Sequence, residues 1–170
     1  MKRTVLLLAL SILLCISGCS SENTTNASGT EFYYLRSDII YGAEDGVITS
    51  ELYQGQVNSL AVLLEAYLRG PSTEGLVSPF PRGTYIMFSQ LKGSTLTLRL
   101  SNHVSTLSPF DQTLAYACLA KTCFAYSDIT EIRLQADDSD ALTVLTPESL
   151  ILSDSTDTIH ATIGTEPLSP

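Results

Sequence analysis

The sequence predicts an α+β domain in which a single sheet carries two helices on one face. Apolar residues recur at helical spacing in two segments, 57–69 and 109–126. Strand-like segments stand before, between and after them, in the order strand, helix, strand, strand, helix, strand. One sheet with both helices on the same face is the economical packing of this order. We expect it to span residues 31–153.

The first strand is expected at Glu31–Ser37, which is short, apolar and aromatic. A loop follows, with only Val47–Ile48 extended. The first helix is expected over Val57–Arg69, where apolar residues recur three and four apart. Gly70 stands where a left-handed cap belongs, and Pro71 prevents the helix from continuing.

A hairpin of Thr84–Gln90 and Ser94–Ser101 is expected next, with Gly93 in its turn. In its second strand three leucines alternate with polar residues, so they should share the buried face: Leu96, Leu98 and Leu100.

Ser108 and Pro109 begin the second helix as its N-cap and first residue, and Asp111 completes a Ser-x-x-Asp box. Its expected buried stripe is Phe110, Leu114, Ala117 and Cys118. The closing strand is expected at Asp128–Gln135, with Ile132 and Leu134 on one face. A final hairpin is expected within residues 140–154, and residues 154–170 form a polar C-terminal tail.

The N-terminus predicts export. Lys2 and Arg3 precede an apolar run of the length of a signal peptide, shorter than the ~20 residues of a membrane-spanning helix. Ile16–Cys19 follows, and an aliphatic residue, two small ones and a cysteine resemble the lipobox of bacterial lipoproteins. The resemblance implies a signal peptide over residues 1–18 and a lipid on Cys19. An ordinary signal peptide with a chance cysteine stays open; Cys15, which follows a leucine, fits the cleavage site badly.

Residues 19–30 are expected to be a flexible tether, and the membrane contact is expected through the lipid alone. The chain has a formal charge of −9, which becomes −11 when the two basic residues of the signal peptide are removed. This acidity excludes nucleic acid as a partner, because phosphates need a basic surface.

The segment LLEAYLRGPSTEGLVSPFPRGTYI, residues 63–86, resembles the GerMN domain, the sporulation and spore-germination domain of Gram-positive envelope lipoproteins. Its distinctive residues are Gly70, Pro71, Pro81 and Gly83, and the resemblance extends over Phe32–Asp138. The glycine that family members often carry after the last strand is missing here, where Asp137, Asp138 and Ser139 stand.

The resemblance implies a non-catalytic protein-interaction domain without a cofactor, with a fold similar to ring-building domains. Its partners would be other envelope or sporulation proteins, or further copies of itself. An extracytoplasmic ligand-binding or cell-wall-remodelling lipoprotein remains the alternative. The glycine-rich loop itself predicts a joint, because anion-binding loops precede a helix and this one follows a helix.

Candidate catalytic and metal-binding groups are sparse. His103 has Ser101 and Ser105 beside it and Asp111 further on, so a hydrolytic triad can be drawn, but a solvated loop histidine is the favoured interpretation. The other histidine, His160, is distant in sequence. Two acidic groups could be drawn as calcium ligands, but solvated turns are favoured for both: Asp137, Asp138 and Asp140; and Glu44 and Asp45. No metal site and no catalytic residue is therefore predicted.

Cys118 and Cys123 are five residues apart, too far apart in a continuous helix for a disulfide. Two buried thiols are favoured, and a bridge would require the helix to end near Lys121. Aromatic residues crowd the first third of the domain, and those not in the core would suit a protein interface: Phe32, Tyr33, Tyr34, Tyr41 and Tyr53.

Overall fold

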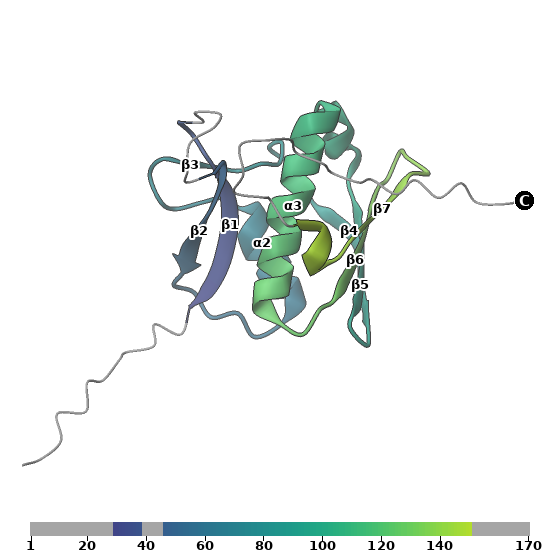
Figure 1. Ribbon diagram of the computed structural model, residues 1–170, viewed down its shortest axis with the longest axis horizontal. Coiled ribbons are helices and arrows are strands. Elements are labelled where there is room, and N and C mark those ends of the chain that lie inside the picture. The colour runs from purple at the N-terminus through teal and green to yellow at the C-terminus, as the bar shows by residue number, and fades with distance from the viewer. Residues whose placement is uncertain (1–28, 39–45, 151–170) are drawn as a thin grey trace, which may run out of the picture.

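The strands form two sheets instead of the single predicted one. The computed structural model describes residues 29–38 and 46–150, and within them the α+β class with two α-helices is confirmed. The first sheet has the order β2-β1-β3 and the second the order β4-β5-β6-β7 (Figure 1). The first contains β1 (Thr30–Arg36), β2 (Ile48–Tyr53) and β3 (Leu76–Val77). The second contains β4 (Ile86–Lys92), β5 (Thr95–Leu100), β6 (Glu131–Ala136) and β7 (Leu142–Leu145).

Helix α3 (Pro109–Tyr126) lies between the two sheets (Figure 1). It connects β5 to β6, which run parallel and therefore need such a crossover. On its other side it contacts β1, where the Tyr33 backbone N–H donates to Thr122 Oγ1 at 2.9 Å. Because α3 occupies this space, β1 cannot join the larger sheet, and it pairs with β2 and β3.

The segment after β1 contains more strand than the sequence predicted. The loop after β1 was expected to contain two extended residues, whereas β2 is a six-residue strand antiparallel to β1. Phe32 and Tyr34 alternate into the core from β1 and are fully buried. The Phe32 ring stacks on Tyr53 of β2 with 4.7 Å between centroids, so aromatic packing stabilises the pairing.

Helix α2 (Leu60–Leu68) starts three residues later than its apolar periodicity predicted. The reason is a cap: Ser59 has an extended backbone, and its Oγ accepts the Val62 N–H at 3.3 Å. The C-terminal end matches the prediction, since Gly70 has φ +93° and its N–H donates to Tyr67 O.

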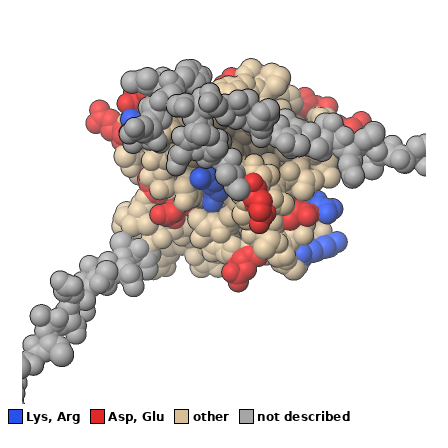
Figure 2. Space-filling model, in the orientation of Figure 1, with Lys and Arg blue, Asp and Glu red and all other residues tan. Residues whose placement is uncertain are grey.

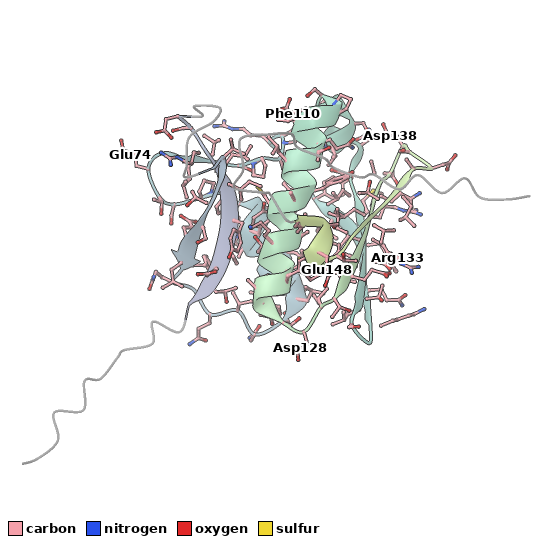
Figure 3. The ribbon with its side chains drawn as sticks, in the orientation of Figure 1. Glu74, Phe110, Asp128, Arg133, Asp138 and Glu148 are labelled. Carbon is pink, nitrogen blue, oxygen red and sulfur yellow. The ribbon has the colours of Figure 1, made fainter. Side chains whose placement is uncertain are left out.

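Helix α3 begins as predicted. Ser108 Oγ accepts the Asp111 N–H at 3.2 Å and donates to Asp111 Oδ2 at 2.7 Å. Leu114, Ala117 and Cys118 are buried, but the prediction for Phe110 was wrong, since 43% of its surface is exposed. Phe110 lies in the first turn, at the end of α3 seen at the top of Figure 3, beyond the layers that cover the middle of the helix.

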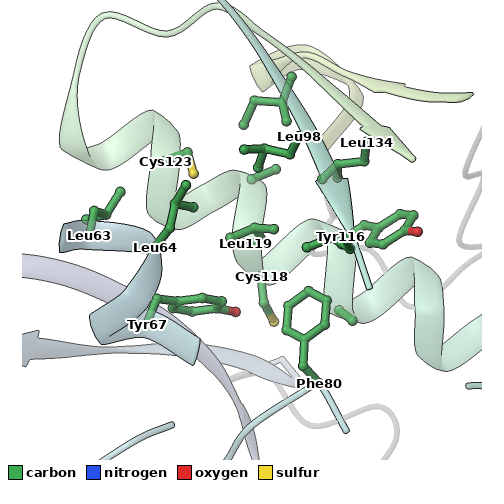
Figure 4. Packing of buried hydrophobic residues seen from close by; sticks show 14 of the residues in the cluster. Leu63, Leu64, Tyr67, Phe80, Leu98, Tyr116, Cys118, Leu119, Cys123 and Leu134 are labelled. Atoms are coloured by element: carbon green, nitrogen blue, oxygen red, sulfur yellow. The ribbon is translucent and has the colours of Figure 1, made fainter. Parts of the chain in front are cut away.

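The core contains side chains of both sheets and of the two α-helices, and Figure 4 shows part of it. The alternation predicted for β5 and β6 is confirmed, because Leu96, Leu98, Leu100, Ile132 and Leu134 are all fully buried. Leu119 of α3 and Leu64 of α2 pack into the same cluster. A final hairpin is not observed in the described residues; β7 pairs with β6, and a 3-10 turn, η3 (Pro147–Leu150), follows it.

Candidate interaction surface

Apolar side chains are exposed along β4 and immediately before it. Strand β4 ends the larger sheet and is paired only with β5 within the described residues. Four large apolar residues keep 45–54% of their surface exposed there: Tyr85, Met87, Phe88 and Leu91. We call residues 85–92 the β4 edge.

The β4 edge exposes an apolar side chain on each face of the sheet. Leu91 stands opposite Leu96, so it points to the face that bears the core. Phe88 stands opposite Arg99 and points to the other face. A strand that covered the core on one face alone would carry polar residues on the opposite face. The exposed residues of β4 therefore suit contact with another macromolecule better than contact with water.

A groove of about 520 Å³ runs between α2 and the β4 edge. Apolar side chains of both elements line it, among them Leu64 and Leu68 of α2 and Ile86 of β4. An ion pair between Glu65 and Arg69 (2.7 Å) lies on the α2 side, with both side chains about two-thirds exposed. We call this the α2–β4 groove. It is open and mostly apolar, which fits a protein side chain or segment better than a charged small molecule.

The loop between α2 and β4 is held by a carboxylate that sequence reasoning missed. Glu51 of β2 is 9% exposed, and its oxygens accept the N–H groups of Ser72 and Thr73 at 2.9–3.1 Å. Burial raises the pKa of Glu51, but the hydrogen bonds from Thr73 and Ser72 outweigh it and lower the pKa below its usual value. Glu51 and Ser72 are 21 residues apart in the sequence, and no local sequence pattern indicates a contact over that separation.

The four family-motif residues take structural positions. Gly70 and Gly83 have φ of +93° and +87°, where a glycine is favoured. Pro71 follows the end of α2, and Pro81 O accepts both the N–H and the Oγ1–H of Thr84 just before β4. The loop therefore joins α2 to β4, with β3 inside it.

The groups drawn as a hydrolytic triad do not assemble. Ser101 Oγ lies 3.2 Å from His103 Nδ1, but it also accepts the Tyr85 N–H, and Ser101 is 1% exposed. Asp111 is engaged with Ser108 in the cap of α3. The pair of Ser101 and His103 fixes the start of β4 instead, since the ring of His103 packs edge-on against Tyr85 at 6.3 Å.

The acidic residues do not form a cation site in the part of the chain that the structure describes. Asp138 accepts a hydrogen bond from Ser105 Oγ, and it lies away from Asp128 and Glu148 in Figure 3. On the face seen in Figure 2 the acidic side chains are scattered over the surface, with none gathered into a hollow. The same figure shows wide uncharged areas between them.

The two cysteines of α3 are free, buried thiols, as favoured by their spacing. Burial raises the pKa of each to about 12. A thiol with such a pKa is almost wholly protonated at neutral pH and is a poor nucleophile or metal ligand. Cys118 and Cys123 thus belong to the core.

Some of the aromatic residues that crowd the first third of the domain were expected in the core, and those that the structure describes lie mostly there. Phe32 and Tyr34 are buried, and Tyr33 and Tyr53 are half-buried. Among the residues that the structure describes, the exposed aromatic ones are Tyr85, Phe88 and Phe110. A signal for the first two existed: Tyr85–Phe88 is an uninterrupted apolar run in a strand, and alternate residues of a strand cannot all face one core.

Other sequence predictions fall outside the described residues. These are the signal peptide over residues 1–18, the polar tail over residues 154–170, the lipid site Cys19, the second histidine His160, Tyr41, and the acidic pair Glu44 and Asp45. Among the described residues, no helix has the length and apolarity required to cross a bilayer.

Neither a family model nor a curated protein matches the sequence. Solved structures do match. The first GerMN domain of the sporulation protein GerM from Bacillus subtilis aligns with a TM-score of 0.52 and 17% identity, over 66% of this chain and 85% of that one. The tandem GerMN domains of the same protein align with a TM-score of 0.48 and 16% identity, over 66% of this chain and 39% of that one. The described part of this chain therefore has a GerMN-like α+β fold, as the resemblance of residues 63–86 to that domain predicted.

Proposed function

We propose that this chain is a lipid-anchored protein of the outer face of the cell membrane. Its GerMN-like domain binds other proteins without catalysing a reaction. The setting is sporulation, spore germination or assembly of the cell envelope. The domain binds no nucleic acid and needs no cofactor.

The β4 edge with the α2–β4 groove is the observation that carries the protein-binding role. It places four half-exposed large apolar side chains at one sheet edge, next to an open apolar groove. The titratable groups once drawn as a triad serve the fold, since Ser101 binds the start of β4 and Asp111 caps a helix. A surface of this composition recognises a protein by burial of apolar area.

The sporulation setting is supported by the fold, through its likeness to a domain of a sporulation protein. The net charge supports the choice of partner: a chain with 18 acidic and 9 basic residues is repelled by nucleic acid and by anionic lipid headgroups. A covalent lipid then supplies the membrane contact, as two or three acyl chains anchor a protein firmly.

The anchor is tested by fractionating cells that express the full chain with Cys19→Ala. We expect the variant to appear in the soluble extracytoplasmic fraction or as an uncleaved precursor, and the native chain to be in the membrane fraction. Cys15→Ala is the matched control, because Cys15 follows Leu14 and is expected to leave with the signal peptide. A mature Cys19→Ala chain that stays in the membrane fraction would show that the lipid on Cys19 is not the anchor.

The binding role is tested by chemical crosslinking and affinity capture of the full chain from cells sampled in growth and in sporulation. Enrichment of the chain itself, or of spore-channel and cortex proteins, late in development would support the proposal. Capture of wall enzymes or solute transporters in growing cells would instead indicate a general envelope lipoprotein that shares only the fold.

A further inference from the structure

The outer edge of β4 has unpaired backbone groups within the described residues, since β4 pairs only with β5. Edge strands of natural proteins are usually protected by charges, proline or bulges, because an open edge pairs with any strand offered to it. The β4 edge has one charge, Lys92 at its end, and one irregularity, between Ile86 and Phe88. The centre of the strand is unprotected.

This edge also lies in a part of the chain that lacks acidic residues. No Asp or Glu occurs from Gly75 to Phe110, although the whole chain contains 18 of them. Two copies of so acidic a chain repel one another over most of their surfaces. They can approach along the β4–β5 hairpin, which itself carries no carboxylate, while the Glu65 carboxylate beside the groove is ion-paired with Arg69.

We propose that the β4 edge pairs antiparallel with the β4 edge of a second copy, around a two-fold axis at Ser89. This deepens the proposed function by naming the partner as the chain itself, and it rests on that proposal only for the role of the domain as a protein-binding module. Such a contact is isologous, because the same surface serves on both copies.

The register follows from the strand. β4 contains seven residues, Ile86–Lys92, and two copies overlap over all seven only when the axis passes through the central one, Ser89. Leu91 of each copy then lies next to Met87 of the other, the residue at the irregularity between Ile86 and Phe88, so two exposed apolar residues adjoin across the interface. Lys92 residues of the two copies lie at opposite ends of the interface.

The backbone of Ser89 has the direction that this register requires. Lys92 and Thr95 close the two-residue turn at Gly93, where φ is +59°. From that hydrogen-bonded pair, residues of an antiparallel hairpin alternate between facing the partner strand and facing away from it. Ser89 is an odd number of residues from Lys92, so its N–H and C=O point to the outer edge.

The same axis covers the α2–β4 groove. A two-fold axis normal to the sheet keeps the core-bearing faces of both copies on one side. Ser89 and Leu91 are on this face, opposite Leu98 and Leu96, and Ser89 also lines the groove. The two grooves therefore meet at the axis, and each copy covers apolar surface of the other.

Site-directed disulfide formation in the full membrane-anchored chain tests the register. Facing residues at the axis have Cα atoms about 5.5 Å apart, within disulfide range, so Ser89→Cys should form a dimer under mild oxidant. Thr97→Cys is the control, because Thr97 lies on β5 and is three strand spacings, about 14 Å, from its copy. We expect about tenfold more dimer from Ser89→Cys. Equal yields from both, or none above the chain without an added cysteine, would overturn the proposal.

Charge exchange at the axis is a second test that does not depend on a new bond. Ser89 is exposed, so Ser89→Lys and Ser89→Glu should fold, which circular dichroism checks. Each variant alone should sediment as a monomer in detergent, since like charges meet at the axis, and an equimolar mixture should recover the dimer of the native chain. A native chain that sediments as a monomer, or a mixture that stays monomeric, would overturn the proposal.

A failure of the proposed dimer can be distinguished from a failure of the proposed function. A chain that is soluble because Cys19 is not its anchor still dimerises if the β4 edge pairs with itself. A chain that binds only other proteins remains monomeric when purified, and its Ser89→Cys variant gives no homodimer.

Discussion

Glu51 of β2 and Thr73 of the loop after α2 are joined by a hydrogen bond of 2.9 Å, from the Thr73 N–H to Glu51 Oε2. The same carboxylate accepts from the backbone N–H and the Oγ of Ser72. One side chain of the smaller sheet thus fixes the loop that leads to the β4 edge.

Glu51→Gln should lower the free energy of unfolding by about 2 kcal/mol at neutral pH, because the hydrogen bonds to a charged acceptor are weakened. The hydrogen bonds lower the pKa of Glu51 in the folded chain relative to the unfolded one, despite burial, which raises it. The contribution of Glu51 to the free energy of unfolding is therefore fully present above the pKa that Glu51 has in the unfolded chain. It is lost as the pH falls through the lower pKa that Glu51 has in the folded chain.

Urea unfolding of both chains between about pH 3 and pH 7 measures this. The difference between them should shrink as pH falls. Glu65→Gln is the control, because Glu65 is an exposed member of an ion pair on α2. A difference between native chain and Glu51→Gln that is constant over this range would contradict the assignment.

Leu98→Ala should destabilise the domain by about 2–5 kcal/mol, because Leu98 is fully buried between β5 and the helices and its loss leaves a cavity. Phe88→Ala on the neighbouring strand removes a larger side chain but should change the stability by less than about 1 kcal/mol, since Phe88 is 48% exposed. Thermal unfolding of the monomeric Ser89→Lys background compares them without any contribution from association. A larger loss of stability for Phe88→Ala than for Leu98→Ala would show that the core lies on the face of the sheet that bears Phe88, which would contradict the structure.

Gly70→Ala should cost about 1 kcal/mol, because Gly70 ends α2 with φ +93°, a conformation that a Cβ disfavours. The nearest atom to an added Cβ is 3.7 Å away, on Ser78, so the cost comes from the backbone and not from a clash. Gly70→Asn should keep more of the stability, because asparagine is tolerated at such caps. Equal stability of the alanine variant and the native chain would refute the role of Gly70 as the cap.

The thiols of Cys118 and Cys123 should resist alkylation in the folded chain and react fully in denaturant, because burial raises the pKa of both to about 12. Iodoacetamide labelling, followed by mass spectrometry of the peptides, assigns the reaction to each cysteine. Rapid labelling of either thiol without denaturant would show that α3 opens in the native state.

The elements with local signals could be predicted from the sequence. Ser108, Pro109 and Asp111 marked the start of α3, and the alternating leucines of β5 marked its buried face. Gly70 marked the end of α2. Each of these signals acts within a few residues, so it survives without knowledge of the fold.

The partition into two sheets could not be predicted in this way. β1 pairs with β2 across a loop and with the two residues of β3, and what keeps it from the larger sheet is α3, which is distant in sequence. The prediction that Phe110 is buried was wrong for a related reason. Helical periodicity gives the direction of a side chain but not how far the opposing layer extends along the helix.

The candidate interaction surface could be predicted only in part from the sequence. Tyr85–Phe88 is a run of four apolar residues in a segment correctly predicted as a strand, which already indicated exposure on one face. That β4 is an edge strand depends on the order of the sheet, and the groove depends on where α2 packs. Among the aromatic residues of the first third of the domain, the sequence left open which belong to the core, and Phe32 and Tyr34 do.

Photocrosslinking from the β4 edge in living cells tests most directly whether this domain works by binding proteins. A photoreactive phenylalanine analogue is placed at Phe88, or at Glu74 as an exposed control in the loop on the far side of α3 in Figure 3. We predict covalent protein adducts from position 88, containing the chain itself or an envelope or sporulation protein, and far fewer from position 74. Adduct yields that are the same at both positions, or no protein adduct from position 88 in growth or in sporulation, would contradict this prediction.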